Sequence, residues 1–162
     1  MNRALAAVAP ALWLAAACSP TPALHAYWTG TDTGKAVLPA RAALCGARGP
    51  LIILAQSGDT GIGLAIYASE SLAAGQYPIF DPTQGKLRRG AALAARWTRK
   101  LVMADLRGVQ GQVTLDGVRP SLAGHFSGRT AGAVTSASVA IEGSFKAIPV
   151  VTGGADCVGQ SR

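Results

Sequence analysis

The sequence predicts a mainly β protein, with an antiparallel β-sandwich or barrel-like domain that follows an N-terminal apolar signal or anchor segment. Three observations support this prediction. Short apolar runs are separated by Gly, of which the chain has 20. Apolar residues alternate with polar or small residues along much of the second half, as in half-buried strands. These stretches recur about every 8 to 12 residues, a spacing typical of sandwiches and barrels.

The N-terminus has the three parts of an export signal. Arg3 lies near the amino terminus, an uncharged apolar run covers residues 4–17, and the small residues Ala15 and Ala17 precede Cys18. The run is shorter than the roughly 20 residues that a bilayer-spanning helix needs. We therefore predict a signal peptide or membrane anchor over residues 1–17.

Cys18 is a candidate lipidation site. Residues 15–18, "AAAC", resemble the lipobox of bacterial lipoproteins, in which the cysteine is acylated and becomes the new N-terminus. Leu14 lies one position earlier than the usual lipobox leucine, and the same bond also satisfies the rule for ordinary signal peptidase. Lipidation at Cys18 and simple cleavage therefore both remain open.

Residues 18–25 are predicted to form an extended tether, because two prolines in this segment disfavour helix. The folded domain is then expected over residues 26–162. Tyr27 and Trp28 lie at its start and fit two roles, the beginning of a first strand or an aromatic pair at a membrane interface. We expect them to pack in the core.

Two short apolar runs in the first half predict a hairpin. Residues 51–54, "LIIL", end at the turn-forming "QSGD", and residues 61–68, "GIGLAIYA", place alternate apolar side chains on one side. Residues 77–80 form another short extended piece. Residues 91–106 fit both a helical and a strand period, and we predict a strand over 91–98 and a loop or short helical turn after it.

The second half alternates most clearly. Strands are predicted in "VQGQVTLDGV" (109–118), "SLAGHFSG" (121–128) and "SASVAIEGSF" (136–145). In the second of these, alternation directs His125 outward and Phe126 inward. We interpret His125 as a surface side chain rather than a catalytic one.

The three cysteines fit an oxidising compartment. If Cys18 carries a lipid, Cys45 and Cys157 remain as a pair, whereas two buried free thiols are the alternative. A disulfide between them would close a loop of about 110 residues and stabilise the fold by roughly 4 to 5 kcal/mol in the chain-entropy model. We expect no metal site and no cofactor, because there is no CxxC and His25 and His125 stand alone.

The charge is positive and unevenly distributed. Without Arg3 the 15 Lys and Arg become 14, against 8 acids, so the mature chain of 145 residues carries +6. Seven of these cations lie between Lys86 and Arg107, with Asp105 as the one acid. A solvated edge strand would explain this segment, and a docking patch for carboxylates or phosphates is the functional alternative. The candidate partner-binding residues are Lys86, Arg88, Arg89, Arg96, Arg99, Lys100 and Arg107.

A catalytic set is missing from the sequence. There is no G-x-S-x-G pentapeptide, and the Gly58–Gly63 region lacks the Lys and Ser or Thr of a phosphate-binding loop. The acids are scattered and mostly adjoin Gly or Pro, as in turns. The sequence therefore predicts a protein that is not an enzyme.

Four segments in order carry a family resemblance: "LAAGQYPIFDP", "GQVTLDGV", "LAGHFSG" and "IEGSFKAIPV", followed by Cys157. Together they resemble a group of uncharacterised bacterial envelope lipoproteins with a small antiparallel β-sandwich domain. The resemblance covers most of the mature chain and implies a fold and a compartment. Its motifs are strand and turn patterns, so it implies no catalytic residues.

These observations lead to an expected function. We expect an exported, membrane-anchored accessory subunit that docks on the periplasmic face of a larger membrane complex, for example an energy-converting one. The alternative is an envelope module that binds an anionic ligand, polymer or lipid through the same basic segment. The expected partners are the membrane, through the N-terminus, and protein, while nucleic acid is not expected for an exported chain.

Overall fold

The computed structural model describes residues 20–84, 89–99, 102–132 and 138–157. The predicted signal segment and the candidate lipidation site Cys18 lie outside these residues. Within them the chain is mainly β-structure, with two short 3₁₀ helices, η1 (Pro82–Gln84) and η2 (Ala155–Cys157). The mainly β prediction is therefore confirmed.

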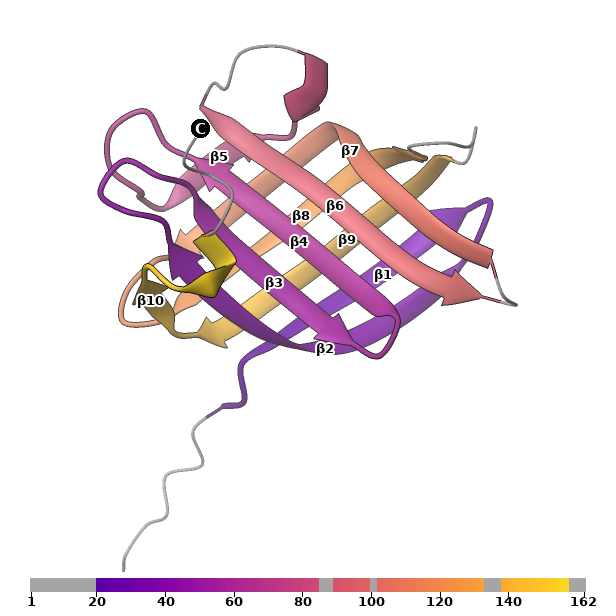
Figure 1. Ribbon diagram of the computed structural model, residues 1–162, viewed down its shortest axis with the longest axis horizontal. Coiled ribbons are helices and arrows are strands. Elements are labelled where there is room, and N and C mark those ends of the chain that lie inside the picture. Colours follow the sequence, from indigo (N-terminus) through magenta and orange to yellow (C-terminus); the bar gives the residue numbers. More distant parts are fainter. Residues whose placement is uncertain (1–19, 85–88, 100–101, 133–137, 158–162) are drawn as a thin grey trace, which may run out of the picture.

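Across the described residues, eight strands form a closed antiparallel barrel (Figure 1). They are β1 (Ala23–Gly30), β2 (Gly34–Leu44), β3 (Leu51–Ser57), β4 (Thr60–Tyr67), β6 (Gly90–Arg99), β7 (Val102–Gly117), β8 (Leu122–Gly132) and β9 (Ser138–Ile148). Each of them pairs with its neighbours in chain order, and β1 pairs with both β2 and β9. This closure leaves no free edge in the sheet. Of the two predicted architectures, the structure has the barrel and not the sandwich.

Two further strands lie beside the barrel strands. β5 (Gly75–Pro78) pairs antiparallel with the second half of β7, next to the stretch of β7 that pairs with β6. β10 (Val150–Thr152) runs parallel to the end of β2. β5 and β10 thus pair with backbone N–H and C=O groups of β7 and β2 on edges where no barrel strand lies beside them.

The observed strands match the predicted hairpin and differ from the prediction at three places. The β3–β4 hairpin is confirmed, and its turn places Gly58 at a φ of 55°, a conformation that suits glycine. Residues 102–106 were expected as a loop or helical turn, but they begin β7, because they find hydrogen-bond partners on β6. Residues 23–25 of the expected tether belong to β1. β2 was not predicted as a strand.

The barrel interior is filled by side chains from every barrel strand. Trp28 stacks on Trp97 with ring centroids 4.6 Å apart, and the Trp97 indole N–H donates to the Asp32 carboxylate at 2.9 Å. The core role expected for Trp28 is confirmed, since only 6% of it is exposed, but the same expectation is wrong for Tyr27, which is 45% exposed and points outward. Phe126 and Phe145 fill the middle of the barrel and lie directly across from Gly143 and Gly124 on the partner strand. The core is therefore a packed one.

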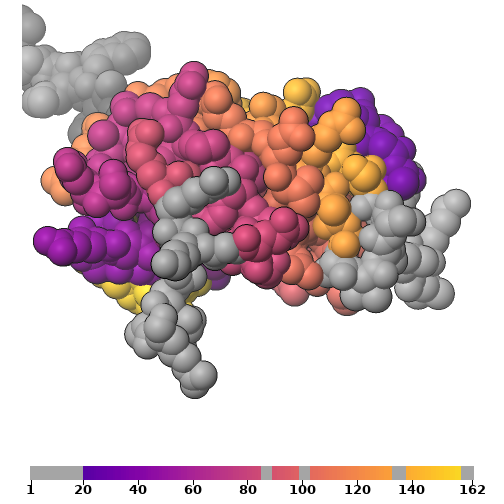
Figure 2. Space-filling model, turned by 90° about the horizontal axis from the view of Figure 1, so that it is seen from above, coloured from indigo at the N-terminus to yellow at the C-terminus, as the bar shows by residue number. Residues whose placement is uncertain are grey.

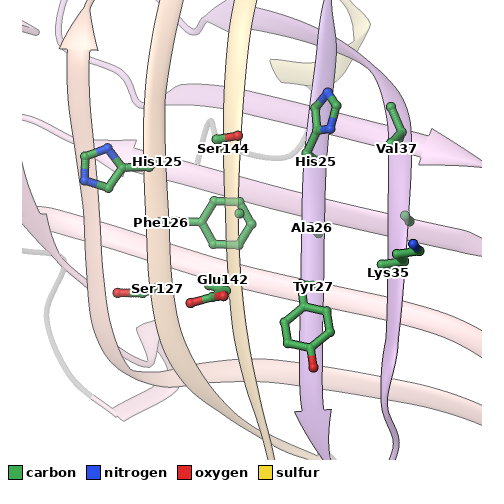
Figure 3. A pocket seen from close by; sticks show the side chains of 12 residues that line it. His25, Ala26, Tyr27, Lys35, Val37, His125, Phe126, Ser127, Glu142 and Ser144 are labelled. Atoms are coloured by element: carbon green, nitrogen blue, oxygen red, sulfur yellow. The ribbon is translucent and has the colours of Figure 1, made fainter.

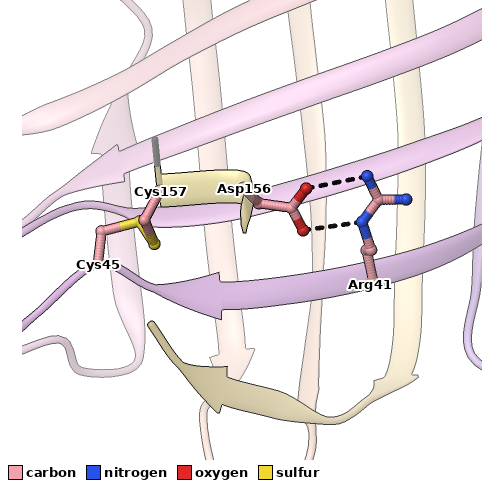
Figure 4. Close-up of a disulfide and its surroundings, with 4 residues drawn as sticks. All are labelled: Arg41, Cys45, Asp156 and Cys157. Carbon is pink, nitrogen blue, oxygen red and sulfur yellow. Dashed lines mark hydrogen bonds and ion pairs between the residues drawn. A yellow bond between two sulfur atoms is a disulfide. The ribbon is translucent and has the colours of Figure 1, made fainter. Parts of the chain in front are cut away.

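The C-terminal residues 150–157, here called the C-terminal clasp, run along the edge of β2 as β10 and then bring η2 to the outer side of the barrel near Arg41 (Figure 4). A disulfide joins Cys157 to Cys45, as predicted. Arg41 on β2 donates two hydrogen bonds to the Asp156 carboxylate at 2.8 and 2.9 Å. The clasp is thus fixed by a covalent bond, a bidentate ion pair and the β10–β2 ladder.

The two ends of the barrel differ in their connections. One end, here called the mouth, carries residues 45–50, 68–74 and 118–121 together with β10, while the tight β1–β2 turn lies at the other end (Figures 1 and 2). In Figure 2 the purple and magenta residues of the mouth connections gather at the left, and the indigo β1–β2 turn lies at the far right. The longest described connections therefore belong to the mouth.

Candidate functional site

One row of outward-facing residues crosses five neighbouring strands of the barrel wall. From β2 to β7 this row consists of Arg41, Leu54, Gly63, Ala94 and Arg107. Each lies directly opposite the next in the strand register. Because adjacent strands are about 4.8 Å apart, the two arginine backbones lie on the order of 19 Å from each other. The row is apolar in its middle and cationic at both ends.

The middle of this row is the floor of a groove. Two hollows, of about 300 and 220 Å³, share Leu54, Gly63 and Ala94 and together form what we call the outer groove. Other small residues complete the floor, namely Gly61, Ala65 and Ala92. Inward-facing side chains of the same strands, such as Leu64, are buried in the core. The absence of large outward side chains at these positions makes the wall concave here.

The outer groove has a wall on each side. Asp156 of the C-terminal clasp lines one side, where its ion pair with Arg41 holds it in place (Figure 4). This contact lowers the pKa of Asp156, because the Arg41 hydrogen bond and charge favour the carboxylate, and it raises the pKa of Arg41. Pro82 of η1 lines the other side. The groove therefore lies between two fixed segments that are far apart in the sequence.

Two further arginines border the groove on its β6 and β7 side. Arg96 lies against Gly61, such that a Cβ on Gly61 would be 3.5 Å from Arg96 Nε. Arg107 is half-buried and faces Asp81, whose pKa is lowered chiefly by hydrogen bonds from Thr83 and to a lesser degree by the charge of Arg107. Among the described residues, neither Arg96 nor Arg107 has a carboxylate oxygen within 4.0 Å. Both guanidinium groups therefore retain donors for an external acceptor.

The predicted basic patch is only partly brought together. Arg96 and Arg107 border the outer groove, whereas Arg89 lies over the Tyr77 ring at 5.0 Å from its centroid. The remaining candidates, Lys86, Arg88, Lys100 and the side chain of Arg99, lie outside the described residues. Arg41 was missed by sequence reasoning. It lies far from the basic segment in sequence, and strand register alone brings it to the same row.

A second hollow, of about 700 Å³, lies on the wall formed by β1, β2, β8 and β9 (Figure 3). Ser144 lies between His125 and His25 in one cross-strand row, and Tyr27 lies between Glu142 and Lys35 in the next. His125 points outward, as predicted, and its Nδ1 is 3.6 Å from the Asp116 carboxylate.

This hollow has the residue types of a catalytic site but not the geometry of one. In the described part of the chain, neither imidazole forms a hydrogen bond with Ser144, and no three His, Cys, Asp or Glu side chains gather as a metal site would need. The side chains of Ser144, His25 and His125 are all exposed, so nothing excludes water from them. The outer groove is therefore the stronger candidate.

Comparisons with known proteins add no family to this description. No protein-family model matches the sequence, no curated protein matches it, and no solved structure matches the fold. Within the described residues, no helix is both long enough and apolar enough to cross a bilayer. The geometry of the barrel surface is therefore the basis for assigning a function.

Proposed function

We propose that this chain is a non-enzymatic, exported protein that is anchored to the membrane through its N-terminus and docks as an accessory subunit on the periplasmic face of a larger membrane complex of the bacterial envelope. The observation that carries the proposal is the outer groove, with its smooth apolar floor and its row from Arg41 to Arg107. The occupant that fits it is an extended segment of a partner protein with small apolar side chains and carboxylates.

The floor of the groove favours a protein segment. Gly63 and Ala94 leave room for side chains from above, and the half-buried Leu54 offers an apolar contact. Apolar surface buried on binding contributes about 25 cal/mol per Å² before the costs of association are subtracted. A floor of small residues also lets a partner backbone approach closely. The groove therefore suits an extended chain better than a bulky side chain.

The rim of the groove favours carboxylates. The Arg41 guanidinium is already engaged with Asp156 in a bidentate pair. Arg96 and Arg107 are not paired in this way among the described residues, so they can each form a bidentate contact with an incoming carboxylate. Asp105 and Asp156 also line the groove, and their carboxylates would repel a segment that carries many acidic residues. We expect one or two acidic residues in the docked segment.

The test is comigration of the full-length chain in native membranes solubilised in mild detergent. Ala94→Lys places a long cation on the groove floor, and Ala140→Lys, at an exposed position of β9 on the opposite wall, makes the same change elsewhere. We expect the wild-type chain and Ala140→Lys to migrate within a large complex and Ala94→Lys to migrate alone. Migration of the wild-type chain alone, or equal retention of both variants, would contradict the proposal.

The same groove allows one competing occupant, an anionic polymer or lipid. In that case the purified domain would bind anionic vesicles without a protein partner, binding would weaken with salt, and Arg96→Glu combined with Arg107→Glu would abolish it. This result would replace the accessory-subunit proposal by that of an envelope binding module.

A further inference from the structure

A further hollow, here called the mouth cavity, lies at the mouth of the barrel and is partly open to solvent. It has a volume of about 840 Å³, within the range of roughly 300 to 1,000 Å³ that is typical of small-molecule sites. Barrel mouths are one of the places where such sites occur. None of its lining residues belongs to the outer groove, so an inference about the mouth cavity is independent of the proposed function.

The floor of the mouth cavity is apolar. Ile66 belongs to the buried core, and Leu44, Val118 and Val150 are half-buried around it. These side chains come from four different segments, β2, β4, the β7–β8 connection and β10. A ligand with a compact apolar body would cover this surface and remove it from water.

Arg48 and Arg119 both line the cavity. Arg48 lies in the connection between β2 and β3, which is held in a tight form. The Cys45 N–H donates to the Pro50 carbonyl at 3.0 Å, and the Cys45–Cys157 disulfide anchors one end of the loop. A Cβ on Gly49 would overlap the Cys45 carbonyl oxygen, so only glycine allows this loop to close so tightly. The guanidinium of Arg48 is thus carried by a constrained backbone.

The charges of the cavity are not compensated within it. In the described part of the chain, neither Arg48 nor Arg119 has a carboxylate partner within 4.0 Å, and Glu70 is the one acid that lines the space. Two cations against one acid, above an apolar floor, match an anion with an apolar body. A cation of the same shape would meet two guanidinium groups and should be rejected.

We propose that the mouth cavity binds a small amphipathic carboxylate, with the apolar body of the ligand on the floor around Ile66 and its carboxylate between Arg48 and Arg119. Such a site would give the protein a small-molecule ligand in addition to its docking surface. Glu70 would limit the affinity by repelling the carboxylate, so Glu70→Gln should tighten binding.

The experiment uses octanoate and octylammonium, which share an alkyl chain and differ in the sign of the head group. Binding to the mature chain is measured by calorimetry, and the site is located by amide chemical-shift changes. We expect octanoate to bind at least about tenfold more tightly than octylammonium, because charge-assisted hydrogen bonds to guanidinium favour the anion. The shifts should concentrate in residues 44–50, 118–119 and 150–152.

Two kinds of variant establish the site. Arg48→Gln with Arg119→Gln should weaken octanoate binding by at least about tenfold, whereas Arg129→Gln, at an exposed position on the outer wall of β8, should leave it unchanged. Ala68→Phe places a bulky ring on the wall of the cavity and retains both arginines, so it should also weaken octanoate binding. No octanoate binding by the folded protein, equal binding of octylammonium, or an unaltered affinity in the double Arg variant would overturn the proposal.

Discussion

Trp28 and Trp97 stack inside the barrel with their ring planes 21° apart, yet among the described residues only one of the two indole N–H groups has a hydrogen-bond partner. Trp97 donates to the Asp32 carboxylate, whereas the buried Trp28 Nε1 meets no acceptor in that part of the chain. The same substitution at the two positions therefore removes nearly the same packing but different polar contacts. This pair allows the hydrogen bond to be separated from the stacking.

Trp97→Phe should lower the free energy of unfolding more than Trp28→Phe. A hydrogen bond to a charged acceptor contributes about 1.5 to 3 kcal/mol, and Trp97→Phe removes this donor from the Asp32 carboxylate. Replacing the unsatisfied Trp28 N–H removes a cost instead of a benefit. Urea unfolding of both variants measures the difference, and an equal or larger effect of Trp28→Phe would contradict the assignment.

The two phenylalanines of the barrel centre require glycine opposite them. A Cβ on Gly143 would overlap the His25 carbonyl oxygen and lie 2.6 Å from the Phe126 ring, and one on Gly124 would overlap the Thr114 carbonyl oxygen and lie 2.7 Å from the Phe145 ring. Gly143→Ala should therefore destabilise the barrel by about 1 to 3 kcal/mol, as overpacking does. Gly117→Ala is the matched control, because a Cβ there meets no atom within 4 Å. Comparable melting temperatures for the two variants would contradict this packing.

The Cys45–Cys157 disulfide should contribute strongly to stability, because it spans 112 residues. Replacing both cysteines by serine should lower the free energy of unfolding by about 2 to 4 kcal/mol. Reducing agent should lower the melting temperature of the natural protein and leave that of the double variant unchanged. A melting temperature of the natural protein that does not respond to reduction would show that the bond is not formed.

The Arg41–Asp156 pair should give the clasp a dependence on acidic pH. Asp156 has a lowered pKa in the folded protein, so its contribution is present above the unfolded pKa of about 4 and is lost as pH falls through the folded value. Because the Arg41 side chain is 64% exposed and water screens the pair, the contribution should stay below about 1 kcal/mol and decrease with salt. In Asp156→Asn, the free energy of unfolding should therefore fall less steeply as the pH is lowered below about 4. Some pH dependence should remain in this variant, because Asp81 also has a lowered pKa in the folded protein. An unchanged dependence on acidic pH would contradict a stabilising pair.

Alternation of apolar and small residues was sufficient to predict the strands that have one buried face. Val113, Phe126 and Phe145 lie inward as their period predicts. β2 was missed because its sequence, "GKAVLPARAAL", is rich in Ala and contains Pro39, and these residues disfavour strands. β2 is nevertheless fixed as a strand by its ladders with β1 and β3. Such pairing is non-local, so a single sequence does not reveal it.

Barrel closure and the outer groove have the same origin in non-local register. The pairing of β1 with both β2 and β9 decides between a barrel and a sandwich, and no local pattern encodes it. The composition of the basic segment could be recognised from the sequence. That Arg107 lies in the same cross-strand row as Arg41 depends on four successive strand pairings. The small floor residues Gly63 and Ala94 fall within predicted strands, but no local pattern indicates that their outward faces meet in a groove.

The most direct test of the docking proposal is site-specific photo-crosslinking in intact membranes. A photo-crosslinking amino acid replaces Ala94 on the groove floor in one version of the chain and Ala140 on the opposite wall in the other. We expect one discrete adduct with a protein of the membrane complex from position 94 and none from position 140. The same adducts from both positions, or no adduct from position 94, would contradict it.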